Sequence, residues 1–148
     1  MKIHDILTPE RTYSGVSLKS KKKVLEFAAE TIARTYPGLF SEDIFETLCA
    51  RERLGSTALG HGVALPHARL PFLQEPLGLL IRLREGVSFD SEDNTPVDLI
   101  FVLVVPQTTT DLHLQLLAQI AEIFSQAEFR ESLRKAATSE VLYELATS

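Results

Sequence analysis

The stretch from Pro96 to Pro106 constrains the fold of this 148-residue chain more than any other segment. It is a nearly continuous run of apolar and β-branched residues with a proline at each end. Because such a run lacks the alternation of a half-exposed strand, it predicts a strand that is buried on both faces. We therefore expect an α/β fold in which helices cover both sides of a sheet.

The rest of the apolar pattern supplies the helices and two more strands. Ser20, Ser41 and Asp111 are each placed to cap a helix, because an apolar stripe of helical period follows each of them. The predicted strands cover 63–65 and 77–83, and the predicted helices cover 21–35, the segments after Ser41 and after Asp111, 128–136 and 139–146. For the helix after Asp111, the predicted inward residues are Leu114, Leu117, Ala118, Ala121 and Phe124.

Length, charge and cysteine content narrow the class of protein. No repeat or linker-like stretch divides the chain, so we expect one domain over residues 1–148. A single cysteine, Cys49, and the lack of a signal peptide predict a cytoplasmic protein without disulfides. No apolar run reaches the ~20 residues of a membrane span, and a net charge of -5 disfavours nucleic acid as a partner. Lys19 and the run 21–23 form a basic cluster, which we interpret as a solvated helix start rather than a docking patch.

The segment with the clearest chemistry presents His67 after a short apolar strand. Pro66 limits the backbone just before it, while Gly60 and Gly62 let the preceding loop turn tightly or approach a ligand. A neutral imidazole attacks phosphorus near physiological pH without a base, because its ordinary pKa is about 6.5. His67 is therefore a candidate nucleophile, although a lone histidine at a strand end is more often a structural group.

Candidate partners of His67 come from a helix start and a helix end. His113 is expected in the first turn after the buried strand, where a neutral imidazole can donate a hydrogen bond to a phosphoryl oxygen. Arg51 can return a guanidinium fork toward His67 from the end of the second helix. Arg53 competes for that role, but helical rotation separates the two arginines by about 200°. The candidate hydroxyl donors, whose more common role is to satisfy their own loop, are Ser56 and Thr57.

A resemblance to a known family rests on residues 51–68, which read RERLGSTALGHGVALPHA. This stretch resembles the active-site signature of the fructose/mannitol-type (type 2) enzyme IIA domain of the bacterial phosphoenolpyruvate-dependent phosphotransferase system. The segments 89–90, 96–106 and 112–114 are similar to the rest of that domain, so the resemblance covers nearly the whole chain. Within the family the chain looks most like the stand-alone nitrogen-regulatory type. The resemblance implies a single-domain mixed β-sheet flanked by helices on both faces.

The resemblance also implies roles for individual residues. His67 matches the histidine that is phosphorylated, on its Nε2 atom, by a small histidine phosphocarrier protein; His113 matches the second active-site histidine, and Arg51 the active-site arginine. No metal or cofactor is implied, and the other expected partners are regulated target proteins. His61 departs from the family pattern, which favours Asn or a small polar residue there, and we expect it to face solvent. The expected docking rim around His67 consists of Leu65, Leu70, Pro71 and Phe72.

Three alternatives to a regulatory phosphocarrier stay open at this stage. The first is a sugar-specific IIA component that passes phosphate to a IIB domain, and the second is a regulatory binding module that no longer uses its histidine. The third is a hydrolase. A metal-assisted version would use His61, His67, His113 and Asp111, but the chain has no H-E-x-x-H motif. A serine version would use Ser56, but the chain has no Gly-x-Ser-x-Gly elbow.

Overall fold

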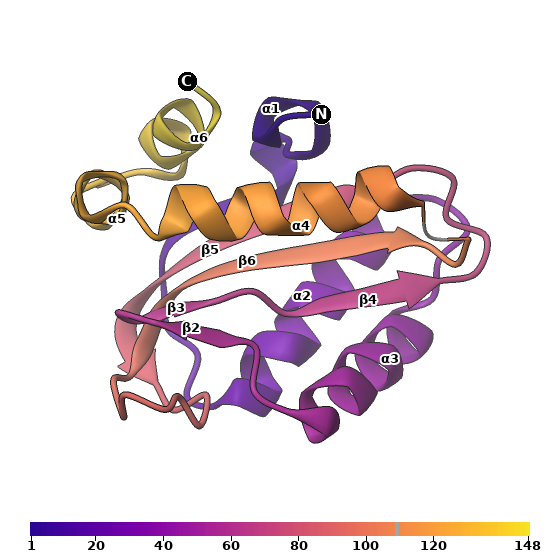
Figure 1. Ribbon diagram of the computed structural model, residues 1–148, viewed down its shortest axis with the longest axis horizontal. Helices are drawn as coiled ribbons and strands as arrows, with labels where there is room; N and C mark the ends of the chain where they lie inside the picture. The colour runs from indigo at the N-terminus through magenta and orange to yellow at the C-terminus, as the bar shows by residue number, and fades with distance from the viewer. Residues whose placement is uncertain (109) are drawn as a thin grey trace.

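The computed structural model describes residues 1–108 and 110–148. Helices lie on both faces of one sheet, and most of its strands follow one another along the chain between two groups of helices (Figure 1). The strands are β1 (Thr12–Val16), β2 (Ala58–Gly60), β3 (Val63–Ala64), β4 (His67–Leu70), β5 (Leu77–Val87) and β6 (Val97–Pro106). The helices are α1 (Ile3–Ile6), α2 (Lys21–Thr35), α3 (Ser41–Leu54), α4 (Asp111–Phe124), α5 (Ala127–Arg134) and α6 (Ser139–Thr147), and a 3-10 turn covers Pro9–Arg11.

The sheet is mixed and has β6 near its centre. Its order is β1-β5-β6-β3-β2, and β4 also pairs with β6. β6 runs antiparallel to β5 but parallel to both β3 and β4, while β1 is parallel to β5 and β2 is antiparallel to β3. The predicted α/β fold with a mixed sheet is therefore confirmed.

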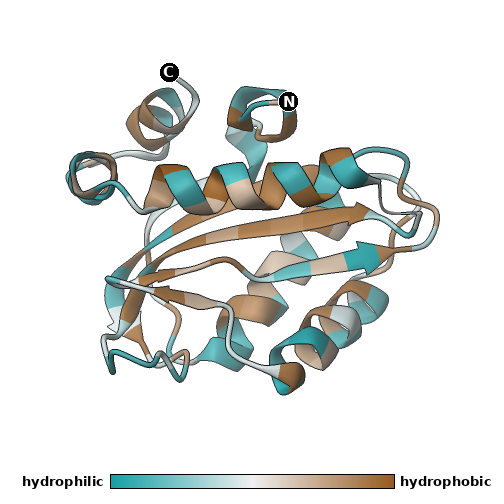
Figure 2. Ribbon diagram, viewed as in Figure 1, coloured by the Kyte–Doolittle hydropathy of each residue, from teal (hydrophilic) through white to brown (hydrophobic). Residues whose placement is uncertain are grey.

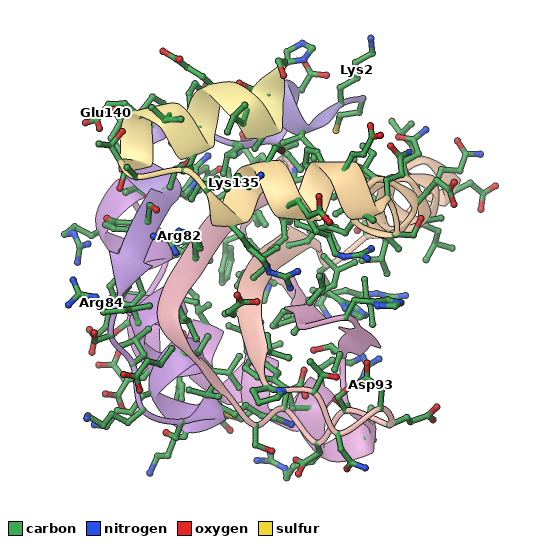
Figure 3. All side chains as sticks on the ribbon, turned by 90° about the vertical axis from the view of Figure 1, so that its left-hand side faces the viewer. Lys2, Arg82, Arg84, Asp93, Lys135 and Glu140 are labelled. Carbon is green, nitrogen blue, oxygen red and sulfur yellow. The ribbon has the colours of Figure 1, made fainter. Side chains whose placement is uncertain are left out.

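The side chains of β6 alternate between two apolar cores, as the pleat of a strand requires. Val102 and Val104 belong to the core that the sheet shares with α2 and α3. Phe101 and Leu103 belong to the core on the opposite face, which α1, α4, α5 and α6 cover. Both β5 and β6 are apolar along most of their length (Figure 2), whereas exposed charged side chains such as Arg84 and Glu140 point outward (Figure 3). The prediction that β6 is covered on both faces is confirmed.

One of the three predicted helix caps is confirmed and two are wrong. The Ser20 hydroxyl accepts a hydrogen bond from the backbone N–H of Lys23 at 3.1 Å, as a capping serine does. α3 begins at Ser41 itself, and Phe40 occupies the cap position without a side-chain bond. α4 likewise begins at Asp111, with Thr110 at the cap position. In both cases the helix starts one residue earlier than predicted.

The inward face of α4 differs from the predicted one. Its buried residues are Leu116, Ile120 and Phe124, so only Phe124 of the predicted buried set is fully enclosed. Leu114 is 55% exposed and Ala118 is exposed as well. The physical reason is that the apolar stripe of α4 is wider than the strip that the sheet covers.

Several short elements were not predicted. These are β1, β2, β4, α1 and the 3-10 turn. The predicted strand over 63–65 ends at Ala64 and gives way to β4, which begins at His67. Among the residues that the structure describes, no helix has the length and hydrophobicity that a membrane crossing needs.

Candidate functional site

The hydrogen bonds of the His67 ring define a single neutral tautomer. Its Nδ1 lies 2.9 Å from the carbonyl oxygen of Leu65, which can only accept, so Nδ1 carries the proton. Its Nε2 lies 3.3 Å from Nε of Arg51, which can only donate, so Nε2 holds the lone pair. The two contacts agree, and together they direct a nucleophilic nitrogen toward Arg51.

The surroundings of His67 favour this neutral form. Partial burial lowers the pKa of His67 below its ordinary 6.5, and the positive charge of Arg51 lowers it further. The hydrogen bond to Leu65 and the negative charge of Glu52 act in the opposite direction, but the net shift is downward. The imidazole therefore keeps its lone pair at neutral pH.

His67 follows the carboxyl end of β3, as predicted, but another strand, β4, begins at His67 itself. Pro66 has no N–H, and near this residue β3, which lies between β2 and β6, gives way to β4, which also pairs with β6. His67 is the first residue of β4 and is in register with Leu103 of β6. The His67 ring is thus presented where β3 gives way to β4 along the side of β6.

Arg51 lies in the last turn of α3 and is held at two points. Its Nη1 donates to the carbonyl oxygen of Gly55 at 2.8 Å, while its Nε contacts His67. Arg53, the competing candidate, is exposed and lines neither of the two cavities beside His67. Of the two arginines, the structure therefore brings only Arg51 to His67.

His113 lies in the first turn of α4 with its ring turned back to the start of the helix. The backbone N–H of Thr110 donates to Nδ1 of His113 at 3.3 Å. In the neutral ring this leaves the proton on Nε2, so Nε2 is a hydrogen-bond donor. His113 and His67 have complementary tautomers, one offering a donor and the other a lone pair.

The three candidate residues line one cavity of about 500 Å³. It is bounded by the end of α3, β4, β6 and the start of α4, and it includes Arg51, His67, Arg69 and His113. An adjoining cavity of about 350 Å³ also contains Arg51 and His67, and it extends between the loop after α3 and α4. The sequence-predicted site residues thus share one hollow on the surface.

The rim of the site is apolar, but it consists of other residues than predicted. Leu65 and Leu70 are buried at 4% and 1% exposure and cannot form a docking surface. Leu54 and Leu114, at 85% and 55% exposure, border the larger cavity instead, and Leu59 borders the smaller one. Of the predicted rim, Pro71 and Phe72 are exposed.

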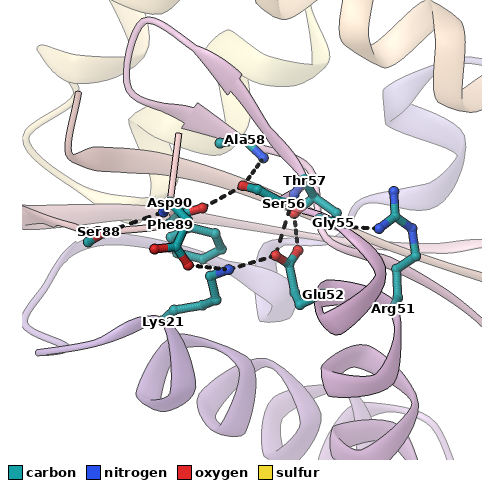
Figure 4. A network of polar contacts seen from close by, with 10 residues as sticks. All are labelled: Lys21, Arg51, Glu52, Gly55, Ser56, Thr57, Ala58, Ser88, Phe89 and Asp90. Atoms are coloured by element: carbon teal, nitrogen blue, oxygen red, sulfur yellow. Dashed lines mark hydrogen bonds and ion pairs between the residues drawn. The ribbon is translucent and has the colours of Figure 1, made fainter. Parts of the chain in front are cut away.

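Ser56 and Thr57 use their hydroxyls inside the protein, as loop residues commonly do. The Ser56 hydroxyl donates to the carbonyl oxygen of Phe89 and accepts from the N–H of Ala58, and the Thr57 hydroxyl donates to Glu52 (Figure 4). Neither is free to donate to a ligand. Ser56 also makes no hydrogen bond to His67, so the serine hydrolase has no geometric support.

Glu52 is a buried charged residue next to Arg51 that the sequence reasoning missed. Its side chain is only 5% exposed, and it forms an ion pair with Lys21 at 2.9 Å. A signal was present in the sequence, because Ile44, Leu48 and Glu52 follow one another at intervals of four and so share one helix face. A charged residue in line with two buried apolar ones requires a buried partner.

His61 faces away from the site, as expected. It is exposed, sits in the turn between β2 and β3 with a positive φ of 56°, and lines a different cavity with Asp98 and Arg134. Asn tolerates this left-handed backbone well, which is the physical reason why that residue type suits the position.

The metal-assisted hydrolase also lacks support. His61 is separated from the cavity that holds His67 and His113. In the part of the chain that the structure describes, no group of three or more His, Cys, Asp or Glu side chains is arranged to hold a metal ion. Cys49 packs against the core, as a structural thiol would, and burial raises its pKa.

Fold and site together define a mixed-sheet α/β domain that presents a neutral histidine beside an arginine, in a cavity that a second histidine also lines. Comparison with known proteins places this domain. Residues 5–148 match the family described as "Phosphoenolpyruvate-dependent sugar phosphotransferase system, EIIA 2". The chain belongs to this family of phosphotransferase-system components.

Several relatives that match nearly the whole chain share one description. The chain is 46% identical over 145 residues to a nitrogen regulatory protein of Pseudomonas aeruginosa, covering 98% of this chain and 94% of the relative. It is 35% identical over 148 residues to the nitrogen regulatory protein of Escherichia coli, covering 99% and 90% of the two chains. The crystal structure of nitrogen regulatory protein IIA-Ntr from Neisseria meningitidis matches with a TM-score of 0.91 and 41% identity over 98% and 99% of the chains. Mannitol IIA of Escherichia coli shares the fold, with a TM-score of 0.76 at 20% identity over 94% and 97%.

Proposed function

We propose that this chain is a phosphohistidine carrier in which Nε2 of His67 accepts a phosphoryl group from a small histidine phosphocarrier protein. The observation that carries the proposal is the tautomer of His67, which leaves the Nε2 lone pair unprotonated in a surface cavity. Membership of a phosphotransferase-system family supports the same reading. The single cysteine and the reducing environment that it implies favour the cytoplasm as the place of action.

The transfer needs no net proton and no added reagent. Nε2 of His67 forms a bond to phosphorus as the nitrogen–phosphorus bond of the protonated donor phosphohistidine breaks, and the donor ring leaves as neutral imidazole. The positive charge then resides on the His67 ring, whose Nδ1–H already donates to Leu65. Because a phosphoimidazole is exchanged for a phosphoimidazole, the reaction is nearly balanced in free energy.

Arg51 and His113 are proposed to hold the transferred group. In the resting protein the Nε–H of Arg51 occupies the lone pair of His67, so the guanidinium shifts off that nitrogen as phosphorus arrives. It can then donate to phosphoryl oxygens as a planar fork while Nη1 keeps its contact with Gly55. The Nε2–H of His113 supplies another donor from the same cavity. Prepositioned donors of this kind lower the barrier by stabilising charge where it develops.

A regulatory role is proposed rather than a sugar-specific one. Relatives that are 46% and 35% identical over nearly the full chain are nitrogen regulatory proteins. A fructose-specific EIIABC component of Bacillus subtilis is 24% identical, and the chain covers 23% of its length. We therefore propose that phosphorylation of His67 changes the charge of the apolar-rimmed site and so controls binding to regulated target proteins of nitrogen, potassium or carbon metabolism.

The test is phosphorylation by the purified upstream carriers, followed by mass spectrometry and by acid treatment. The wild-type protein is expected to gain one acid-labile phosphoryl group, and the His67→Ala variant none. His61→Ala serves as the matched control, because His61 lies outside the cavity that contains His67. This variant is expected to be labelled like the wild type. Labelling of His67→Ala at one acid-labile site would refute the assignment.

The same experiment separates the alternatives. A sugar-specific component would pass its phosphoryl group to a fructose or mannitol IIB domain added to the labelled protein, and we expect no such transfer. A binding module that has lost its chemistry would bind its partners normally but remain unlabelled in both the wild-type and the His67→Ala proteins.

A further inference from the structure

The carboxylate of Glu52 is buried directly behind the candidate site. Lys21 of α2 binds it, with Nζ 2.9 Å from Oε2. The backbone N–H and the hydroxyl of Thr57 also donate to it. The side chains of Glu52 and Lys21 are 5% and 20% exposed. A charge removed from water to this degree is costly unless it is paired and hydrogen-bonded, and here it has three donors.

The bonds of Thr57 continue from Glu52 to His67. Thr57 donates its N–H and its hydroxyl to the two carboxylate oxygens, which fixes the residue on the side facing α3. On its other side, the carbonyl oxygen of Thr57 accepts from the N–H of Leu65 at 3.0 Å. The carbonyl oxygen of Leu65 in turn accepts from Nδ1 of His67. A continuous path of hydrogen bonds therefore joins Glu52 to the nitrogen that sets the tautomer of His67.

The loop braced by Glu52 also holds Arg51. Gly55, whose carbonyl oxygen anchors Nη1 of Arg51, lies between Glu52 and Thr57 in the sequence. One end of this short loop continues from α3, and the other end is held at Thr57 by the carboxylate of Glu52. The position of the Gly55 oxygen therefore depends on the bonds between Glu52 and Thr57. Figure 4 shows Arg51 on one side of the loop and the Glu52 carboxylate on the other.

Lys21 connects this brace to a third part of the fold. Its Nζ also lies 3.3 Å from Oδ2 of Asp90, and 5.3 Å from the centre of the Phe89 ring. Because the Asp90 side chain is 82% exposed and Glu52 is not, Glu52 is the principal partner of Lys21. Lys21 thus neutralises the buried carboxylate rather than forming part of a basic surface patch.

We propose that Glu52 and Lys21 are positioning residues: the buried ion pair fixes Thr57, and through it the orientation of the His67 ring and of Arg51, for phosphoryl transfer. This inference rests on the proposed function of His67. Neither residue lines the two cavities that contain His67, so they act through the loop and not on the phosphoryl group. In-line transfer is sensitive to such placement, because an error of about 1 Å can cost up to about 100-fold in rate.

The experiment compares Glu52→Gln, Thr57→Val and Thr57→Ser in the full chain. Phosphoryl transfer from the phosphorylated histidine phosphocarrier gives kcat and KM, and nitrogen NMR of the His67 ring reports its tautomer. Glu52→Gln and Thr57→Val are expected to lower kcat by about 10- to 100-fold, with KM within about twofold, and to give mixed tautomers at His67. Thr57→Ser keeps the hydroxyl and is expected to restore both readouts.

Matched controls separate positioning from a general loss of charge or of structure. Glu46 lies on the exposed face of α3, and Lys22 is the exposed neighbour of Lys21. Neither Glu46→Gln nor Lys22→Met is expected to change kcat or the NMR signals of His67. Lys21→Met is expected to behave like Glu52→Gln. Circular dichroism establishes that each variant is folded; if Glu52→Gln is not, the pair Thr57→Val and Thr57→Ser carries the test.

Two results would overturn the proposal. The first is a folded Thr57→Val variant whose kcat and His67 spectrum equal those of the wild type. The second is a rise in KM at constant kcat, which would make the network a partner contact. If the wild type itself takes no phosphoryl group, the proposed function fails, whereas the NMR comparison still decides whether Glu52 orients His67.

Discussion

At the scale of single residues, the protonation of His67 sets the pH range in which the site works. Burial places its pKa below 6.5, so the ring remains neutral as the pH falls past that value. We expect the fraction of His67 that keeps its Nε2 lone pair to stay constant from pH 8 to below 6.5 and to decline only as the pH passes through the lowered pKa. NMR titration of the His67 ring, with the urea-unfolded chain as the control, measures that pKa directly. A midpoint at or above the unfolded value would contradict the expectation.

The lowered pKa of His67 also makes the free energy of unfolding depend on pH. Between the lowered pKa and 6.5 the unfolded chain binds a proton at His67 that the folded chain does not. The contribution of His67 to the free energy of unfolding is therefore fully present above pH 6.5 and falls as the pH drops below it. His67→Gln removes this dependence, so the two proteins should differ in the slope of unfolding free energy against pH in that range, as measured by urea denaturation.

Arg51 and Arg53 test whether charge or geometry matters near His67. Lysine keeps the charge but has no Nε–H beside its terminal nitrogen and no planar fork. Arg51→Lys is expected to lower kcat for phosphoryl acceptance by about 100-fold, because it loses the bond to His67 or the one to Gly55. Arg53→Lys, the exposed neighbour, is expected to change kcat by less than about twofold. If both variants kept the kcat of the wild type, charge alone would matter, because lysine keeps the charge at both positions.

At the scale of elements, the turn between β2 and β3 depends on Gly62. This residue has a φ of +77°, and an added Cβ would lie 2.6 Å from Nη2 of Arg134 and 3.0 Å from Oδ1 of Asp98. Gly62→Ala therefore combines a left-handed backbone cost of about 1–2 kcal/mol with overpacking that costs about 1–3 kcal/mol. Gly38→Ala is the control, because φ is +93° there and nothing lies within 4 Å of an added Cβ. Urea denaturation should show the larger loss for Gly62→Ala, and equal losses would mean that Arg134 moves aside freely.

Long elements were predictable from the sequence, whereas short ones were not. β6 shows as a long, nearly continuous apolar run and α2 as an apolar stripe of helical period, so the type and the bounds of both can be read. β1 contains Gly15 and the polar Ser14, whose backbone N–H bonds to Ser139 far along the chain, so its place in the sheet depends on tertiary contacts. β2 and β3 have three and two residues, which is too short for any period to show.

The site could be predicted in part: the candidate residues could be found from the sequence, but the exposed rim around them could not. His67, Arg51 and His113 were accessible because each chemistry belongs to a residue type at a recognisable place in a helix or loop. The rim was not, because sequence periodicity marks apolar residues without showing which of them another element covers. Leu65 and Leu70 are buried by the sheet, while Leu114 of the predicted α4 core is left on the surface beside the cavity.

At the scale of the whole molecule, β5 and β6 join two cores that lie on opposite faces of one sheet. Leu79 belongs to the core beneath α2 and α3, and Leu99 to the core beneath α4. Because these two strands share a long ladder and serve both cores, damage to one core should weaken the other. The His67 site lies at the edge of the same sheet and should therefore be lost in the same transition.

Leu79→Ala and Leu99→Ala test this coupling. Each leaves a cavity and is expected to lower the free energy of unfolding by about 2–5 kcal/mol, out of a total of about 5–15 kcal/mol for a domain of this kind. Tyr36 packs against the first core and Tyr143 against the second, so NMR of labelled tyrosine in a urea titration reports both faces at once. In each variant the two tyrosine signals should disappear at one shared midpoint, lower than in the wild type. If Leu99→Ala moved the midpoint of Tyr143 and left that of Tyr36 in place, the two faces would unfold separately and the sheet would not couple them.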